Sequence, residues 1–320
     1  MTPAIIIITI LAYFATILAI SWFTGRKADN AGFFSGNRKQ SWYVVAFAMI
    51  GSAMSGVTFV SVPGMVAASG FGYMQMTLGF IAGQLVIAFV LVPLFYKMNL
   101  VSIYGYLENR FGISSYRTGA WFFFISKMLG ASVRLYLVCI ALQLMVFTPL
   151  GVPFHVNVLV TILVLLAYTY RGGVKAVIWI DFLKTFCMLV SIILCTIFIS
   201  KALGFTFGSM CHAVADSGMS RIFYFDDPDH PQYFFKQFFG GMFTLIAMTG
   251  LDQDMMQRSL SCRNVKDSQK NIITSALLQT VVIFLFLVLG VLLYLFAGTY
   301  QIPEAAGDRL FPAVATSGLL

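Results

Sequence analysis

The sequence has few charged residues. Only 10% of its 320 residues are Asp, Glu, Lys or Arg, whereas a soluble globular domain usually carries about 25%. Hydrophobic residues make up 59% of the chain and aromatic residues 16%. A chain with so few charges cannot cover a water-facing surface. The composition therefore excludes an ordinary soluble protein and predicts one whose solvent is lipid.

Side chains that bind metals or act in catalysis are also scarce. The three histidines lie in polar linkers and form no HExxH motif, and the five cysteines show no CxxC or paired spacing. This pattern argues against a zinc site, a disulfide framework and a membrane-embedded enzyme. The net charge of +8 comes from basic residues spread over short loops, so we expect no nucleic-acid partner.

What the sequence does have is long apolar runs. A helix that crosses a membrane needs about 20 predominantly apolar residues. The segments that meet this requirement are 3–24, 42–68, 73–97, 119–148, 154–170, 177–200, 234–256 and 272–298. We expect an all-α membrane protein with about eight transmembrane helices, forming a single transmembrane domain over residues 1–320.

Basic residues concentrate in the loops on one side of the predicted membrane. These loops are 25–41, 97–118, 171–176 and 257–271, whereas the loops of the other side contain only Lys201, Arg221, Lys236 and Arg309. Since basic loops stay in the cytoplasm, the N-terminus is expected outside. The predicted location is the bacterial inner (cytoplasmic) membrane, with the lipid bilayer as a partner.

Two predicted spans contain runs of small residues. The second span has Gly51-Ser-Ala-Met-Ser-Gly56, and the seventh has Gly240-Gly241 followed by Thr249-Gly250. One interpretation is that these helices open, near 51–55 and between Gly240 and Gly250, and expose carbonyl groups that bind sodium in a cavity. The alternative is that the small residues let helices pack closely.

Ionisable residues also fall inside the spans, where a charge is costly: Lys127, Arg134, Asp181 and Lys184. Asp181 and Lys184 share a helix face and can pair with each other. Asp181 can instead offer oxygen ligands to a cation. Arg134 can hold a carboxylate through two hydrogen bonds, or it can tether its helix to the backbone carbonyls of a neighbour.

Several motifs resemble those of one known family. They are Ser55-Gly56 with Pro63-Gly64 and Gly70-Phe-Gly72, then Tyr104 to Phe111 (YGYLENRF), Tyr168 to Asp181 (YTYRGGVKAVIWID), and Asp252-Gln253 with Gln257 to Arg263 (QRSLSCR). In this order, and over essentially the whole chain, they resemble the sodium/solute symporters. The stretch that ends at Asp181 is the most specific of them.

The resemblance implies the leucine-transporter fold, in which a leading helix precedes two five-helix repeats of inverted topology. On that map the leading helix is 3–24, the first repeat is about 42–200, and the second repeat begins at about 234–298. Its later helices would follow residue 320. We therefore expect a C-terminally truncated chain that, by itself, neither binds sodium tightly nor transports.

The resemblance also implies sodium-coupled secondary active uptake of a small solute by alternating access, with sodium and the solute as partners. Carried over by position, the sodium-binding residues would be Gly51, Met54, Ser55 and Asp181. Asp181 matches an acidic residue linked to a second sodium in some members, whereas Lys184 stands where the family commonly has Gln.

The substrate expected from the resemblance is a small organic anion. The sugar branch has a Glu near the position of Thr77, which this sequence lacks, and the sialic-acid and monocarboxylate/iodide/multivitamin branches fit better. The expected substrate-binding residues are Ser52, Ser55, Thr58, Thr77, Arg134, Thr249 and Gln253. The alternatives are a symporter for a neutral sugar or polyol, and a substrate-sensing membrane domain of a signalling protein. The sequence predicts no oligomeric state.

Overall fold

The computed structural model of the chain describes residues 3–25, 40–100, 102–148, 150–169, 173–302 and 305–319. These residues are mostly helical, with one isolated β-bridge between Gln40 and Cys262. The prediction of an all-α protein is therefore confirmed. The chain forms two compact units, each assembled from separate stretches of sequence. Unit 1 is Met1–Gln40, Leu94–Ile180 and Asp252–Asn264, and unit 2 is Ser41–Pro93, Asp181–Leu251 and Val265–Leu320.

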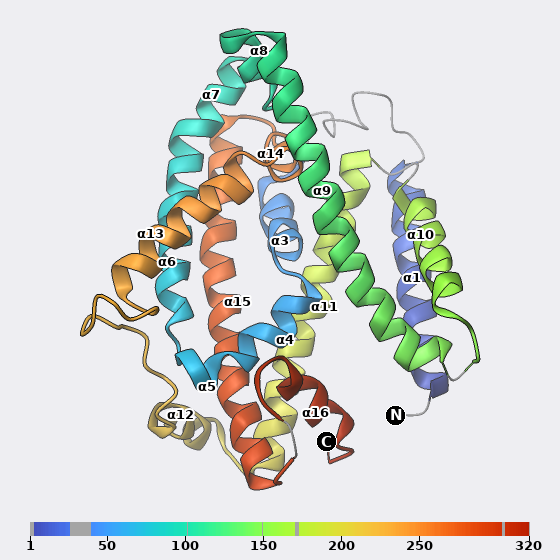
Figure 1. The fold of residues 1–320 in the computed structure, drawn as a ribbon, viewed down its shortest axis with the longest axis vertical. Helices are drawn as coiled ribbons and strands as arrows, with labels where there is room; N and C mark the ends of the chain where they lie inside the picture. Colours follow the sequence, from blue (N-terminus) through green and yellow to red (C-terminus); the bar gives the residue numbers. More distant parts are fainter. Residues whose placement is uncertain are drawn as a thin grey trace. The chain divides into compact units, whose positions relative to one another are not determined.

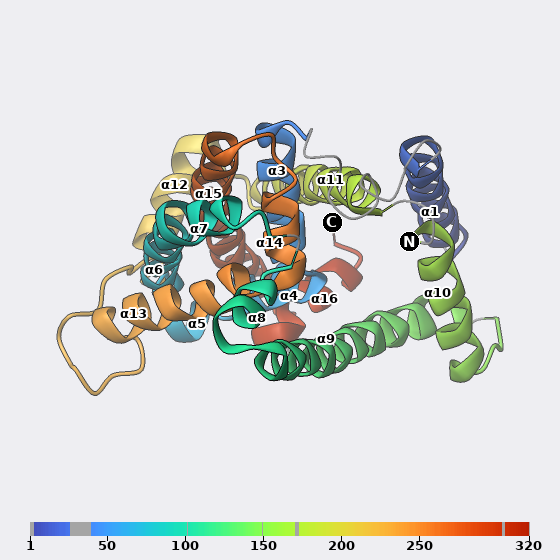
Figure 2. The same cartoon turned by 90° about the horizontal axis from the view of Figure 1, so that it is seen from above.

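Unit 2 is organised around one long helix, α15 (Val265–Thr299), as Figure 1 shows. The helices that pack against α15 are α3 (Trp42–Ala53), α4 (Gly56–Gly64), α5 (Val66–Ser69), α6 (Tyr73–Val86), α12 (Phe207–Asp216) and α16 (Leu310–Thr316). A further helix, α13 (Phe234–Leu245), lies beside α6 in both Figure 1 and Figure 2.

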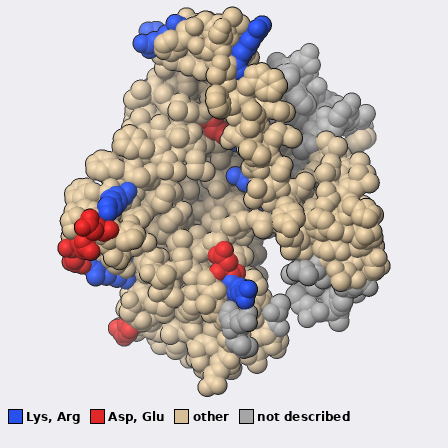
Figure 3. Space-filling model, in the orientation of Figure 1, with Lys and Arg blue, Asp and Glu red and all other residues tan. Residues whose placement is uncertain are grey.

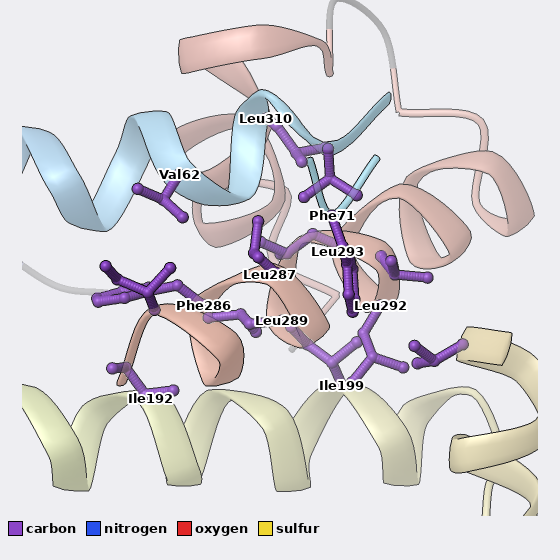
Figure 4. Close-up of a cluster of buried hydrophobic side chains, with 14 of the residues drawn as sticks. Val62, Phe71, Ile192, Ile199, Phe286, Leu287, Leu289, Leu292, Leu293 and Leu310 are labelled. Carbon is purple, nitrogen blue, oxygen red and sulfur yellow. The ribbon is translucent and has the colours of Figure 1, made fainter. Parts of the chain in front are cut away.

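The core of unit 2 is an apolar cluster centred on α15. Figure 4 shows this helix passing between α4, which contributes Val62, and α11 (Gly173–Ala202), which contributes Ile192 and Ile199. Phe286 and Leu289 of α15 are fully buried between them. Because lipid tails are as apolar as these side chains, close packing rather than escape from water holds the cluster together.

The second predicted span is broken. Helix α3 ends at Ala53, and Met54 (φ −100°, ψ 132°) and Ser55 (φ −111°, ψ 172°) are extended before α4 begins at Gly56. The axes of the two helices differ by 66°. The prediction of non-helical backbone near 51–55 is confirmed, and the opening lies at Met54–Ser55.

The predicted break between Gly240 and Gly250 is wrong. Helix α13 passes through both Gly240 and Gly241, a π-helical segment continues it to Gly250, and regular structure stops only at Leu251. Gly241 serves close packing, since a Cβ at this position would lie 2.4 Å from the backbone carbonyl oxygen of Met76 on α6. The close-packing alternative therefore holds for Gly241.

Unit 1 contains α1 (Pro3–Gly25), α8 (Gly105–Phe111), α9 (Ile113–Leu142), α10 (Phe154–Thr169) and α14 (Gln253–Ser259). Helix α1 lies beside α10 in Figures 1 and 2. The side chain of Asn157 on α10 is buried and donates to the Cys139 carbonyl oxygen on α9, at 2.7 Å. This hydrogen bond satisfies a polar group that lipid could not. Helix α7 (Val92–Lys97) and α11 contribute residues to both units.

Apolar helices occupy the predicted spans. Among the described residues, four helices are long and apolar enough to cross a membrane, and the pairs α3–α4 and α13–α14 bring the number to six if each pair is one span. Helices α1 and α10 contain shorter apolar stretches, so the total of eight stays a prediction. Figure 3 shows few charged side chains on the visible face, as lipid contact requires.

Some boundaries differ from the prediction. Helix α9 begins at Ile113 rather than at 119, α15 begins at Val265 rather than at 272, and the linker 201–233 contains α12. Residues 26–39 and 170–172, which carry part of the predicted orientation and part of one family motif, lie outside the described residues.

Candidate functional site

The break at Met54–Ser55 deprives the last backbone carbonyls of α3, that of Gly51 among them, of their helical donors. In a continuous helix the Ser55 N–H would donate to the Gly51 carbonyl oxygen. Here it donates instead to the Thr58 Oγ1 in the first turn of α4, 3.2 Å away, as in one half of a capping box. Carbonyl groups freed at such a break inside a membrane are typical sodium ligands.

Asp181 lies on α11 against the same end of α3. It is 8% exposed, and its Oδ2 accepts a hydrogen bond from the Ser52 hydroxyl at 2.8 Å. The Lys184 Nζ lies 4.0 Å from the other carboxylate oxygen, at the outer limit of an ion pair. The short contact of Asp181 thus joins two helices, and pairing with Lys184 is the weaker of the two interactions.

Gly51 allows α3 to approach α11 this closely. A Cβ on Gly51 would lie 2.4 Å from the Thr185 Oγ1 and 2.6 Å from the Asp181 carbonyl oxygen. The buried Thr185 hydroxyl lies 3.0 Å from the Phe47 carbonyl oxygen on α3 and 2.8 Å from that of Asp181. Carboxylate, hydroxyl and carbonyl oxygens therefore gather where the two helices meet, and such oxygens suit a hard cation.

The other predicted site residues of unit 2 lie either at the break or on other helical elements. Met54 is buried at the break, 2% exposed, and Thr58 lies in the following turn. Thr77 and Thr249 are buried on other elements, α6 and the π-helical segment after α13. The Thr77 hydroxyl donates to the Tyr73 carbonyl oxygen of its own helix at 3.0 Å, so this donor is already used.

Arg134 and Gln253 belong to unit 1. Arg134 is exposed on α9, and within unit 1 the described residues give its guanidinium no hydrogen-bond or ion-pair partner. The Gln253 side chain accepts a hydrogen bond from the Ile103 N–H at 2.9 Å. The amide of Gln253 thus holds the connection that precedes α8.

The family follows from a comparison of the whole sequence. The model of the Sodium:solute symporter family matches residues 33–314. The chain belongs to the sodium:solute symporter family. The predicted family is confirmed, and with it the prediction of a transporter family rather than an enzyme.

Two relatives show what this symporter-family chain is similar to. The sodium/sialic acid symporter NanT of Aliivibrio fischeri is 27% identical over 93% of this chain and 58% of its own length. The sodium-coupled monocarboxylate transporter 2 of Bos taurus is 30% identical over 76% of this chain and 39% of its own length. The chain thus spans about half the length of these relatives or less.

A solved structure has the same fold. It is the substrate-bound, outward-open state of a Na⁺-coupled sialic acid symporter, with a TM-score of 0.82, 20% identity, and coverage of 96% of this chain and 64% of that one. The match confirms the predicted leucine-transporter fold, and members of this family are multi-pass membrane proteins.

The symporter-family chain also contains an ion pair that its sequence spacing did not predict. In unit 1 the Lys127 Nζ on α9 lies 2.6 Å from the Oδ2 of Asp252. The other carboxylate oxygen of Asp252 caps α14 by accepting from the Met255 N–H at 3.2 Å. Burial raises the pKa of the Tyr104 phenol above its ordinary value, and the negative charge of Asp252 raises it further. Lys127 and Asp252 both lie inside predicted spans, where an unpaired charge is costly. This was the signal in the sequence from which their pairing could have been predicted.

Removing either charge of this pair is expected to destabilise unit 1. We expect a coupling free energy of about 1–2 kcal/mol between Lys127→Met and Asp252→Asn, because the two side chains are 43% and 16% exposed and so lie between surface and buried pairs. The coupling is obtained from a double-mutant cycle of these two substitutions. Because Asn at position 252 retains the cap on α14, the cycle isolates the contribution of the charge. Thermal unfolding in detergent measures it.

The matched control is Asp254→Asn, on the same helix but paired with Arg258. Its cycle with Lys127→Met is expected to show coupling near zero. Equal coupling in both cycles would mean that the Lys127–Asp252 contact adds nothing specific.

Proposed function

We propose that the protein carrying this chain takes up a small organic anion together with sodium, by alternating access across the bacterial inner membrane with its N-terminus outside. The observation that carries the proposal is the opened helix at Met54–Ser55 beside Asp181. The family assignment and the names of the relatives support sodium coupling.

The sodium part rests on the oxygens around Asp181. A carboxylate 8% exposed inside a membrane costs at least about 2.5–3.5 kcal/mol unless it is compensated. Ser52 supplies one hydrogen bond, and the Lys184 side chain, 41% exposed, stands 4.0 Å away. A sodium ion bound by the Asp181 carboxylate and the Gly51 carbonyl would add a positive charge directly at the carboxylate. Met54 and Ser55 would add oxygens from the open backbone.

The anionic substrate rests on Arg134. A π-helical segment, Gln143–Phe147, continues α9, and Arg134 lies about 20 Å along the helix axis from its end at Phe147, well inside the span. A guanidinium at such a depth requires an anion or a carbonyl partner. Two relatives are named for acids, sialic acid and monocarboxylates. In the proposal the substrate carboxylate binds the Arg134 guanidinium.

Arg134→Lys tests this assignment. In proteoliposomes containing the full product of the gene, the variant is expected to raise the apparent KM for sialic acid or a short monocarboxylate at least about tenfold, because lysine cannot form the two parallel hydrogen bonds of a guanidinium. Sodium-dependent tracer uptake measures the change. Binding without uptake would support a substrate-sensing domain instead.

The control for this substitution is Arg117→Lys, an exposed arginine on the same helix. It is expected to leave the KM unchanged. If Arg134→Lys also leaves the KM unchanged, the substrate is not held through this guanidinium, and neutral sugars or polyols become the better candidates.

A further inference from the structure

Unit 2 has a second concave site, separate from the residues assigned to sodium and solute. It is a groove with a volume of about 430 Å³, formed by the last turns of α11, by α12 and by α15. Apolar side chains line most of it, among them Ile193 and Ile197 of α11, Phe207 of α12 and Leu285 of α15. A groove of this size is large enough for part of a small amphipathic molecule.

Two polar groups in this groove lack a partner. Ser200 is 8% exposed, and its Oγ has no hydrogen-bond partner among the described residues. Lys201 is exposed in the last turn of α11 and forms no ion pair in the described part of the chain. A buried hydroxyl without a partner is costly. A ligand that fills the groove and carries an acceptor and a negative charge would satisfy both groups.

The depth of the groove matches one leaflet of a bilayer. From Ile192 to Lys201 the helix rises about 14 Å, close to half of the roughly 30 Å hydrocarbon core. Lys201 lies at the end of an apolar helix long enough to cross the membrane, and Phe205 and Phe207 follow it. Basic and aromatic residues at the end of a span lie at the level of the lipid headgroups.

We propose that this groove binds an anionic phospholipid. One acyl chain lies along α11 between α12 and α15, the phosphate contacts Lys201, and an oxygen of the headgroup or glycerol accepts from the Ser200 hydroxyl. Charge complementarity selects the anionic lipid, since a zwitterionic headgroup offers Lys201 no net charge. A soluble anion would leave the apolar walls unfilled. The proposal does not depend on the transported solute.

Native mass spectrometry tests the proposal on protein released from nanodiscs that contain equal amounts of phosphatidylglycerol and phosphatidylethanolamine. The wild type is expected to retain phosphatidylglycerol about fivefold over phosphatidylethanolamine, the preference that one lysine near a headgroup supplies. Lys201→Ala is expected to abolish this preference. Lys201→Arg, and the control Lys266→Ala at an exposed lysine on α15, are expected to keep it.

A second variant fills the groove. Thr196→Trp, at a position that lines it, is expected to lower retained phosphatidylglycerol while thermal unfolding stays close to that of the wild type. The proposal is overturned if Lys201→Ala matches Lys266→Ala, or if Thr196→Trp retains the lipid. It is also overturned if inorganic phosphate displaces the lipid. A decrease in dimer content alone in Lys201→Ala and Thr196→Trp would overturn it as well, because a second copy of the chain would then occupy the groove.

Discussion

Asp181→Asn is expected to raise the sodium concentration needed for half-maximal uptake at least about tenfold. Removing a residue that only hydrogen-bonds to a metal ligand commonly weakens metal binding 10- to 100-fold. Asp181→Asn removes the charge of the only charged side chain proposed to bind the sodium ion. Asn has the same size and can still accept the hydrogen bond from Ser52, which spans 2.8 Å in the native protein. The loss should therefore report on charge rather than on packing. Sodium titrations of tracer uptake by the full gene product measure it.

Asp216→Asn is the matched control, because Asp216 is exposed on α12. It is expected to leave the sodium dependence unchanged. Ser52→Ala should give a smaller increase than Asp181→Asn, since it removes a hydrogen bond and not a charge. Should Asp181→Asn behave like the control, the Asp181 carboxylate would be a structural group that binds no ion.

Gly79→Val is expected to destabilise unit 2 more than any substitution on the lipid-facing side of the same helices. A Cβ at Gly79 would lie 2.1 Å from the Phe238 carbonyl oxygen and 2.9 Å from the Met242 backbone nitrogen. Both atoms belong to the backbone of α13, so a side chain can be accommodated only if α6 and α13 separate. Overpacking of this kind costs about 1–3 kcal/mol, and more where the backbone cannot yield. Thermal unfolding in detergent measures the loss.

Gly240→Val is the control for this substitution. Gly240 lies on α13, and a Cβ there meets no atom within 4 Å among the described residues. The control is expected to unfold at nearly the wild-type temperature. Similar unfolding temperatures for the two variants would show that α6 and α13 are not held by their close approach.

The helices and their lipid environment could be predicted from the sequence because hydrocarbon leaves the backbone few choices. Where no water is available, backbone groups must bond within their own segment, so apolar runs of about 20 residues become helices. The run that contains α15 illustrates this, although its polar first turns from Val265 to Asn271 lay outside the predicted span. Hydropathy does not report a helix that extends beyond the membrane.

The candidate site was predictable in part. The motif ending at Asp181 and the small residues around Gly51 were visible as patterns, and the structure joins them through Ser52. The pair Lys127–Asp252 was not predicted. Spacing along a helix shows which residues share a face, but a contact between distant segments depends on how helices pack.

The sequence by itself determined that this is an all-helical membrane protein of the symporter family, because composition, apolar run length and ordered motifs are properties of the chain alone. Only the tertiary structure decided what its glycines do. Gly51 lies one turn before an opened backbone, whereas Gly241 lies in an unbroken helix that packs against Met76. The same residue type permits either outcome, and the backbone that lies opposite it selects between them.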